Sequence, residues 1–258
     1  MLDLAGNEYG KDGPPLIVVH GLFGSARNWA GIARSLSETC RVYALDLRNH
    51  GGSPHSQTMT YAEMAADVAG FIFSNGIVEP IIMGHSMGGK VAMRLALEEP
   101  NLIKGLVVVD IAPVTYGHDM MDYITAMQML DLSGEQRRVE LEKELQRVVE
   151  DPAIAAFLMT NLERANDGYH WRINLQAIAT AMSEISGFPV LDGAMFGGPT
   201  AFIAGEHSAY IHQNHSDRVL ELFPNARTVT IKDASHWVHA DQPESFLRAV
   251  SSFIETVV

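Results

Sequence analysis

The chain has 258 residues, of which 47% are hydrophobic and 19% charged, a balance typical of a folded globular protein and not of a disordered one. With 18 Lys and Arg against 31 Asp and Glu, the net charge is −13, so we expect neither nucleic acid nor a membrane surface as a partner. The single Cys40 cannot form an internal disulfide, and the chain has no signal-peptide pattern and no apolar run of the roughly 20 residues that cross a bilayer. We therefore expect a cytoplasmic protein.

Short apolar runs alternate with segments of helical periodicity through most of the chain. The expected strands are residues 16–20, 41–47, 80–84, 105–110, 200–204 and 227–231, and the expected helices are residues 29–36, 61–73, 88–98, 212–222 and 243–257. Strands that alternate with helices pair as a parallel sheet covered on both faces. The pattern predicts an α/β fold with a mostly parallel, doubly wound sheet.

The alternation stops between residues 113 and 198. This interval holds only helix-like stretches, at 134–149, 153–164 and 171–186, and no clear strand. We expect a core made of residues 1–112 and 199–258, with residues 113–198 inserted as a helical cap, or lid. Four methionines of the lid either line an apolar pocket or fill its interior: Met120, Met121, Met127 and Met129.

Ser86 lies in the pentapeptide Gly84-His85-Ser86-Met87-Gly88, between an expected strand and an expected helix. In that context the pattern Gly-x-Ser-x-Gly forms a sharp turn, the nucleophile elbow, that exposes the serine hydroxyl above the sheet. Glycine is needed on both sides because a side chain there would collide with the neighbouring helix or strand. Ser86 is the predicted nucleophile.

A serine hydroxyl needs a base to take its proton, and in this kind of site the base follows the serine in the chain. His236 comes shortly after the last expected strand, at the carboxyl edge of the sheet where the elbow also lies. His239 is the alternative, although it is further from the strand end. We predict His236 as the base.

The acid that orients the base has two candidates. Asp110 ends the strand before the lid, and Glu206 follows the strand after it, where Ser208 occupies the place that an aspartate often takes. Asp110 is the preferred acid, with capping of the segment 111–113 as its structural alternative.

Acyl transfer also needs donors for the oxyanion. The backbone amides of Leu22 and Met87 are the candidates, because one follows the first clear strand and the other follows the nucleophile. His20 is expected to brace its loop. Phe23, His85 and Trp237 are expected to line the substrate site.

Four motifs in order resemble the α/β-hydrolase superfamily. They are His20-Gly21-Leu22-Phe23-Gly24-Ser25, Asp46-Leu47-Arg48-Asn49-His50-Gly51-Gly52-Ser53-Pro54-His55-Ser56, Gly84-His85-Ser86-Met87-Gly88-Gly89-Lys90 and Ser235-His236-Trp237-Val238-His239. The second motif, with Val109-Asp110-Ile111-Ala112-Pro113, is similar to the YbfF-type bacterial esterases and their mitochondrial abhydrolase relatives. The resemblance implies the α/β-hydrolase fold, a carboxylic ester or acyl-CoA thioester hydrolase without cofactor or metal, and an acid at Asp110. Residues 1–13 leave little room for the leading strands of this fold, so we expect a trimmed sheet edge.

The sequence therefore predicts a serine esterase that hydrolyses carboxylic esters of small to medium acyl chains. An acyl-CoA thioesterase is the nearest alternative, and a lyase or a non-catalytic small-molecule binder on the same fold is an alternative of another class. Arg48 is expected to pair with a carboxylate and order the loop of residues 46–53, a structural role.

Overall fold

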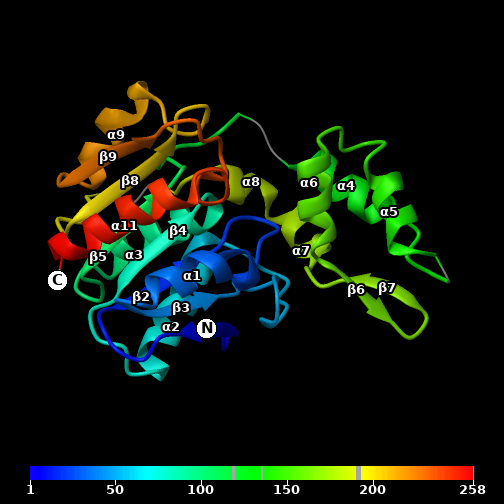
Figure 1. Ribbon diagram of the computed structural model, residues 1–258, viewed down its shortest axis with the longest axis horizontal. Helices are drawn as coiled ribbons and strands as arrows, with labels where there is room; N and C mark the ends of the chain where they lie inside the picture. The colour runs from blue at the N-terminus through cyan, green and yellow to red at the C-terminus, as the bar shows by residue number, and fades with distance from the viewer. Residues whose placement is uncertain (118–119, 135, 190–192, 258) are drawn as a thin grey trace.

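A seven-stranded sheet forms the centre of the protein in the computed structural model, which describes residues 1–117, 120–134, 136–189 and 193–257 (Figure 1). The strand order is β1-β3-β2-β4-β5-β8-β9, with every pair parallel except β1 with β3. The strands are β1 (Gly6–Tyr9), β2 (Pro15–Val19), β3 (Arg41–Leu45), β4 (Ile81–His85), β5 (Gly105–Val109), β8 (Thr200–Gly205) and β9 (Ala226–Ile231). The predicted mostly parallel α/β sheet is confirmed.

Helices cover both faces of this sheet (Figure 1). One face packs against α1 (Ala30–Leu36) and α11 (Pro243–Val257). The other packs against α2 (Tyr61–Ser74), α3 (Met87–Glu98) and α9 (Ser216–Leu222). Three short helical segments lie in the connecting loops: η1 (Ala26–Trp29), η2 (Gln213–His215) and α10 (Val238–Asp241).

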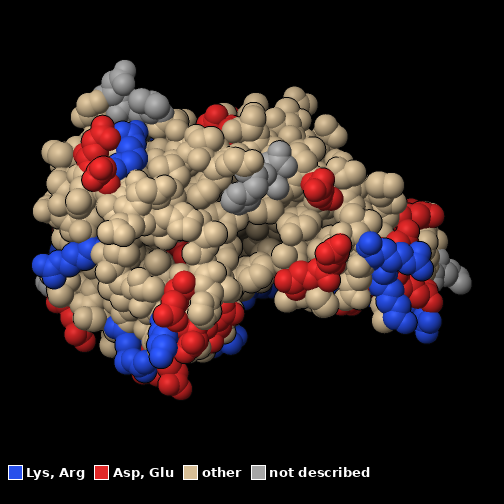
Figure 2. Space-filling model, turned by 90° about the horizontal axis from the view of Figure 1, so that it is seen from above, with Lys and Arg blue, Asp and Glu red and all other residues tan. Residues whose placement is uncertain are grey.

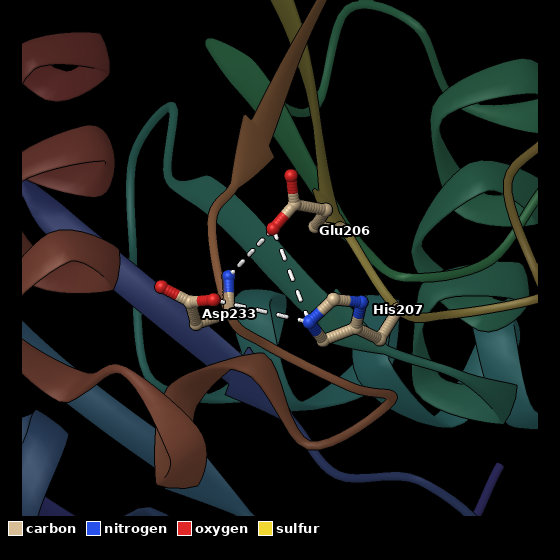
Figure 3. A group of neighbouring side chains, drawn as sticks. All are labelled: Glu206, His207 and Asp233. Atoms are coloured by element: carbon tan, nitrogen blue, oxygen red, sulfur yellow. Dashed lines mark hydrogen bonds and ion pairs between the residues drawn. The ribbon is translucent and has the colours of Figure 1, made fainter.

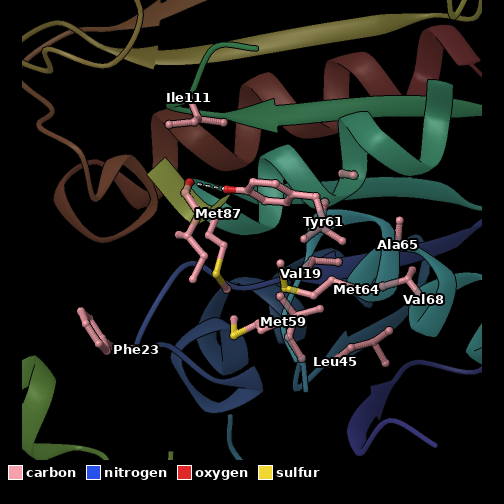
Figure 4. Close-up of a cluster of buried hydrophobic side chains, with 14 of the residues drawn as sticks. Val19, Phe23, Leu45, Met59, Tyr61, Met64, Ala65, Val68, Met87 and Ile111 are labelled. Atoms are coloured by element: carbon pink, nitrogen blue, oxygen red, sulfur yellow. Dashed lines mark hydrogen bonds between the residues drawn. The ribbon is translucent and has the colours of Figure 1, made fainter. Parts of the chain in front are cut away.

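Side chains of the strands alternate between the two helical layers, as the period of two along a strand requires. In β2, Ile17 and Val19 join the cluster beneath α2 and α3, whereas Leu16 and Val18 join the cluster beneath α1 and α11. Figure 4 shows part of the first cluster, which includes Val19 together with Met64 of α2 and Met87 of α3. Because both faces are buried, the central strands read as continuous apolar runs in the sequence.

One leading strand, β1, precedes β2 in the residues for which a trimmed sheet edge was expected. Residues Gly6–Tyr9 pair in register with Val42–Leu45 of β3. The strand was not predicted because its side chains are exposed or half-buried, so that it has no apolar run to recognise. Its polar, short form is typical of an edge strand.

The segment between β5 and β8, residues 113–198, is called the lid below. It lies beside the core in Figure 1 and contains α4 (Met121–Met129), α5 (Arg138–Leu145), α6 (Pro152–Met159), α7 (Leu175–Thr180) and α8 (Met182–Ser186). It also contains an antiparallel hairpin of β6 (Leu162–Ala165) and β7 (Gly168–Trp171). The expectation of a lid without strands was therefore wrong. Its two-residue loop is Asn166-Asp167, residue types that favour turns, between two strands of only four residues each.

Cys40 is buried and carries a free thiol, as expected from its place before an apolar run. None of the helices in the described ranges combines the length and hydropathy needed to cross a bilayer.

Candidate active site

Ser86 sits in a strained turn between β4 and α3. Its backbone has φ 52° and ψ −122°, a conformation that residues other than glycine rarely adopt. A Cβ atom on Gly84 would lie 2.1 Å from the carbonyl oxygen of Gly88, and one on Gly88 would lie 2.4 Å from the carbonyl oxygen of His20. The two glycines therefore allow the close packing of strand, turn and helix that the sequence pattern predicted.

Asp110 and His236 are brought together from strand ends that are far apart in the chain. Asp110 follows β5 with φ 51°, and its fully buried Oδ2 lies 2.7 Å from Nδ1 of His236. The other carboxylate oxygen accepts a hydrogen bond from the Gly205 amide at 3.0 Å. An ionised carboxylate only accepts, so Nδ1 carries a proton and Nε2 is left as the acceptor. That is the tautomer that a general base requires.

Two residues that the sequence analysis assigned no role support this pair. The hydroxyl of Ser208 donates to Oδ2 of Asp110, and the Tyr210 ring stacks on the His236 imidazole with centroids 4.1 Å apart. Ser208 was noted only as a replacement for an aspartate, and its position three residues after β8 was the signal for a contact at this strand end.

Glu206, the alternative acid, points elsewhere. Figure 3 shows it beside His207 and Asp233, with its Oε2 accepting from the Asp233 amide at 3.0 Å. Its Oε2 also lies 4.0 Å from Nε2 of His207, and all three residues are exposed. Exposed acidic groups of this kind are common without a metal, so this cluster by itself assigns no metal site.

A tight turn carries the Leu22 amide next to the elbow. The Gly24 amide donates to the Gly21 oxygen at 3.0 Å, which closes a turn over residues 21–24. A Cβ on Gly21 would lie 3.2 Å from Cβ of Ser86, so the turn passes directly over the serine. Leu22 follows Gly21 in this turn and Met87 follows Ser86 in the chain, and the role of their amides as oxyanion donors stays a prediction.

Two buried histidines fix this turn. His20 donates from Nδ1 to the Gly21 oxygen at 2.8 Å and accepts from the Leu47 amide at Nε2 at 3.0 Å. The second histidine, His50, donates from Nδ1 to the Arg48 oxygen at 3.0 Å. Burial lowers the pKa of His20 to about 4 and that of His50 to about 3, so both are neutral at pH 7. The expected bracing role of His20 agrees with these bonds.

The loop of residues 46–53 is held by buried ionic contacts. Arg48 pairs with Asp67 through Nε to Oδ2 at 2.7 Å and Nη2 to Oδ1 at 3.1 Å. The Asp46 carboxylate accepts from the amides of Ala26 at 2.6 Å and Gly52 at 2.8 Å. The predicted pairing of Arg48 with a carboxylate is confirmed.

His85 joins the elbow to the loop that carries His236. Its Nε2 donates to the backbone oxygen of His236 at 2.9 Å, and burial holds its pKa well below the ordinary value. His239 instead stacks on Trp29, with ring centroids 4.1 Å apart, and has no bond to Asp110 among the described contacts. The structure therefore pairs Asp110 with His236.

Ser86 and His236 open into one cavity of about 430 Å³ between core and lid, which Figure 2 shows as a hollow in the surface. Phe23, His85 and Trp237 line it as predicted, although their contact with a substrate stays a prediction. Of the four methionines considered above, Met120 lines the cavity, Met127 lies in the buried hydrophobic cluster with Met121 half-buried against it, and Met129 is 76% exposed. Other lid residues that line it are Tyr123, Ile154, Phe157, Leu158, Met182 and Ile185.

A buried lysine, unassigned in the sequence analysis, joins the lid to α3. Lys90 donates from Nζ to the Ser186 oxygen at 3.0 Å and to the Gly187 oxygen, where the lid returns to the core. Burial lowers its pKa to about 7. The hydroxyl of Tyr61 donates to the Ile185 oxygen at 2.7 Å beside it (Figure 4). These bonds cap the carboxyl end of α8.

Comparison with known proteins agrees with this architecture. The α/β hydrolase fold family model matches residues 14–243. The chain is 42% identical over 252 residues to the sn-1-specific diacylglycerol lipase ABHD11 of Danio rerio, covering 95% of this chain and 79% of that protein. It is 34% identical to the esterase YbfF of Escherichia coli (strain K12), covering 93% and 92%. A solved marine microorganism esterase, 38% identical, superposes with a TM-score of 0.94 over 98% of this chain and 100% of that one. The chain belongs to the α/β-hydrolase family.

Proposed function

We propose that the protein is a serine esterase in which Ser86 is the nucleophile, His236 the general base and Asp110 the acid that orients the base. The observation that carries the proposal is the 2.7 Å bond from His236 Nδ1 to buried Asp110, in a cavity shared with Ser86. The named esterase and lipase relatives support hydrolysis of a carboxylic ester.

The reaction has two steps. His236 Nε2 takes the hydroxyl proton as Ser86 Oγ bonds to the acyl carbon, and the Leu22 and Met87 amides stabilise the oxyanion. The tetrahedral intermediate then breaks its bond to the leaving oxygen, which takes the proton from His236. Water repeats the sequence on the acyl-enzyme, releasing the acid and restoring Ser86.

The cavity supports an apolar acyl group of small to medium length. Its lining from the lid is mostly apolar and aromatic, and the buried amine of Lys90 is already bonded to backbone oxygens. We further propose that residues 113–198 act as a cap over a core of residues 1–112 and 199–258, so that the lid sets which acyl chains fit.

The test is turnover of p-nitrophenyl esters of two to sixteen carbons, acyl-CoA thioesters and a diacylglycerol, with Ser86→Ala as the control. We expect ester hydrolysis that Ser86→Ala abolishes, together with fluorophosphonate labelling of Ser86. Preference for acyl-CoA would make the protein a thioesterase. A folded protein with no turnover and no labelling would contradict the serine mechanism and favour a binding protein, whereas labelling without turnover would favour a lyase.

A further inference from the structure

We propose that Asn161, a residue of the lid, is a positioning residue that holds the turn of residues 21–24 in the conformation that presents the Leu22 amide to the substrate. The inference rests on the proposed function, in which that amide binds the oxyanion. It assigns the lid a part in the chemical step beyond that of enclosing the substrate.

The turn contains a strained residue that needs external support. Phe23 has φ 61°, in the left-handed region that glycine adopts freely and that a bulky side chain disfavours. Phe23 is the third residue of the turn closed between Gly21 and Gly24, the position where a type II turn requires a positive φ. Left unsupported, the turn can relieve this strain by rotating the Leu22–Phe23 peptide toward a type I conformation.

Two hydrogen bonds hold Phe23 from opposite sides. The core supplies one, since the Phe23 amide donates to Nε2 of His50 at 3.2 Å. The lid supplies the other, since Nδ2 of Asn161 donates to the Phe23 oxygen at 2.8 Å. Both peptide groups that flank the strained residue are therefore fixed.

Asn161 is itself well placed for this task. Its side chain is 3% exposed, and Nδ2 also donates to the Leu158 oxygen at 3.2 Å. Its backbone oxygen accepts from the Arg172 amide at 2.8 Å, which ties the end of α6 to the residue after β7. Both amide hydrogens have acceptors, so the side chain has one favoured orientation.

The hydrogen bonds to Phe23 constrain the orientation of the Leu22 amide through the rest of the turn. The Gly21 oxygen accepts from the Gly24 amide at 3.0 Å and from His20 Nδ1 at 2.8 Å. In a trans peptide the C=O and N–H point in opposite directions, so fixing the Gly21 oxygen fixes the direction of the Leu22 N–H. Rotation at Phe23 would weaken the Gly21–Gly24 bond and with it this orientation.

Asn161→Leu removes the donor and keeps a side chain of similar size. We expect kcat for a short p-nitrophenyl ester to fall about 10- to 100-fold with KM within about threefold, since losing one oxyanion donor outright costs about 10²–10³. Affinity for an alkylboronic acid, whose tetrahedral adduct on Ser86 occupies the oxyanion site, should fall by the same factor as kcat/KM.

The matched control is Trp171→Phe, which removes one hydrogen bond inside the lid, from Nε1 to the Met127 oxygen at 3.0 Å. It should lower the melting temperature and leave kcat and boronate affinity within about threefold. Asn161→Asp, which keeps the shape but places a second acceptor against the Phe23 oxygen, should reduce kcat at least as much as Asn161→Leu.

A double-mutant cycle tests whether the effect of Asn161 depends on the strained backbone of Phe23. In a Phe23→Gly background the positive φ has no steric cost, so the kcat effect of Asn161→Leu should shrink to about threefold or less. Two results would overturn this inference and leave the proposed function intact. One is a kcat effect of Asn161→Leu that is undiminished in the Phe23→Gly background, and the other is a wild-type kcat in Asn161→Leu itself. If the wild-type protein shows no turnover that depends on Ser86, both the proposed function and this inference are wrong.

Discussion

The buried carboxylate of Asp110 lies 2.7 Å from Nδ1 of His236, although 126 residues separate them in the chain. In Asp110→Asn the side-chain oxygen can still accept from the Gly205 amide, but its NH₂ group cannot accept from Nδ1. His236 should then hold its proton on Nε2, where the proposed general base needs a free lone pair. We expect kcat to fall roughly 10³- to 10⁴-fold with little change in the melting temperature.

Glu206→Gln is the matched control for that substitution, because Glu206 was the alternative acid and bonds to the Asp233 amide instead. Steady-state kinetics on a short ester should show wild-type turnover for Glu206→Gln. Equal losses in the two variants would mean that Asp110 is not the orienting acid.

His239 should be dispensable for catalysis. It is 9% exposed and stacks on Trp29, and its buried Nδ1 has no hydrogen-bond partner among the residues that the structure describes. Burial lowers its pKa to about 4. His239→Phe preserves the stack and removes the unpaired nitrogen, so urea titration should show a free energy of unfolding that is unchanged or about 1 kcal/mol higher. Ester turnover should stay within threefold, and a collapse of kcat would reopen the choice of base.

Acid should destabilise the protein through its neutral buried histidines. In the unfolded chain histidine binds a proton below about pH 6.5, whereas folded His20 and His50 stay neutral down to about 4 and 3. The unfolded state therefore binds more protons in this window, and the free energy of unfolding falls as pH drops from about 6.5 toward 4.

Each such histidine contributes a slope of up to about 1.4 kcal/mol per pH unit. Urea titrations between pH 7 and pH 4.5 should show a shallower pH dependence in His50→Gln than in the wild type, by about one proton. Identical slopes would mean that His50 is protonated in the native state.

Arg48→Lys should weaken the fold and spare the chemistry. Lysine keeps the charge but cannot make the two parallel bonds that Arg48 makes to Asp67, so we expect a loss of about 2 kcal/mol in the free energy of unfolding. Turnover by the folded fraction should stay within threefold. Collapsed turnover at an unchanged melting temperature would contradict the structural role of Arg48.

The core and its central residues were predictable because their signals are local. Buried strands such as β4 appear as apolar runs, and the glycines around Ser86 are dictated by contacts closer than 3 Å. His236 was predictable from its place after the last strand. In each of these cases the chemistry depends on a strand end, which the sequence marks directly.

The structure of the lid and the residues that support the proposed site were harder to predict from the sequence. The β6–β7 hairpin has four-residue strands with mixed burial, so only its turn residues identify it. Asn161 has no local signal, because its partner Phe23 lies 138 residues earlier. Lys90 follows Ser86 by one helical turn, yet nothing in the sequence shows which lid oxygens it bonds. Such contacts depend on how the lid docks, a tertiary property that periodicity does not encode.

The position of Asp110 before the lid also bears on the order in which the residues of the proposed site are synthesised. Leu22, Ser86 and Asp110 all precede the lid in the chain, while His236 follows it near the C-terminus. Protein synthesis proceeds from the N-terminus, and folding begins before the chain is finished. In the proposed mechanism, the nucleophile, the acid and the lid are therefore synthesised before the base. Ser86 then has no base to take its proton until the segment that follows the lid, with His236, has been synthesised and folded.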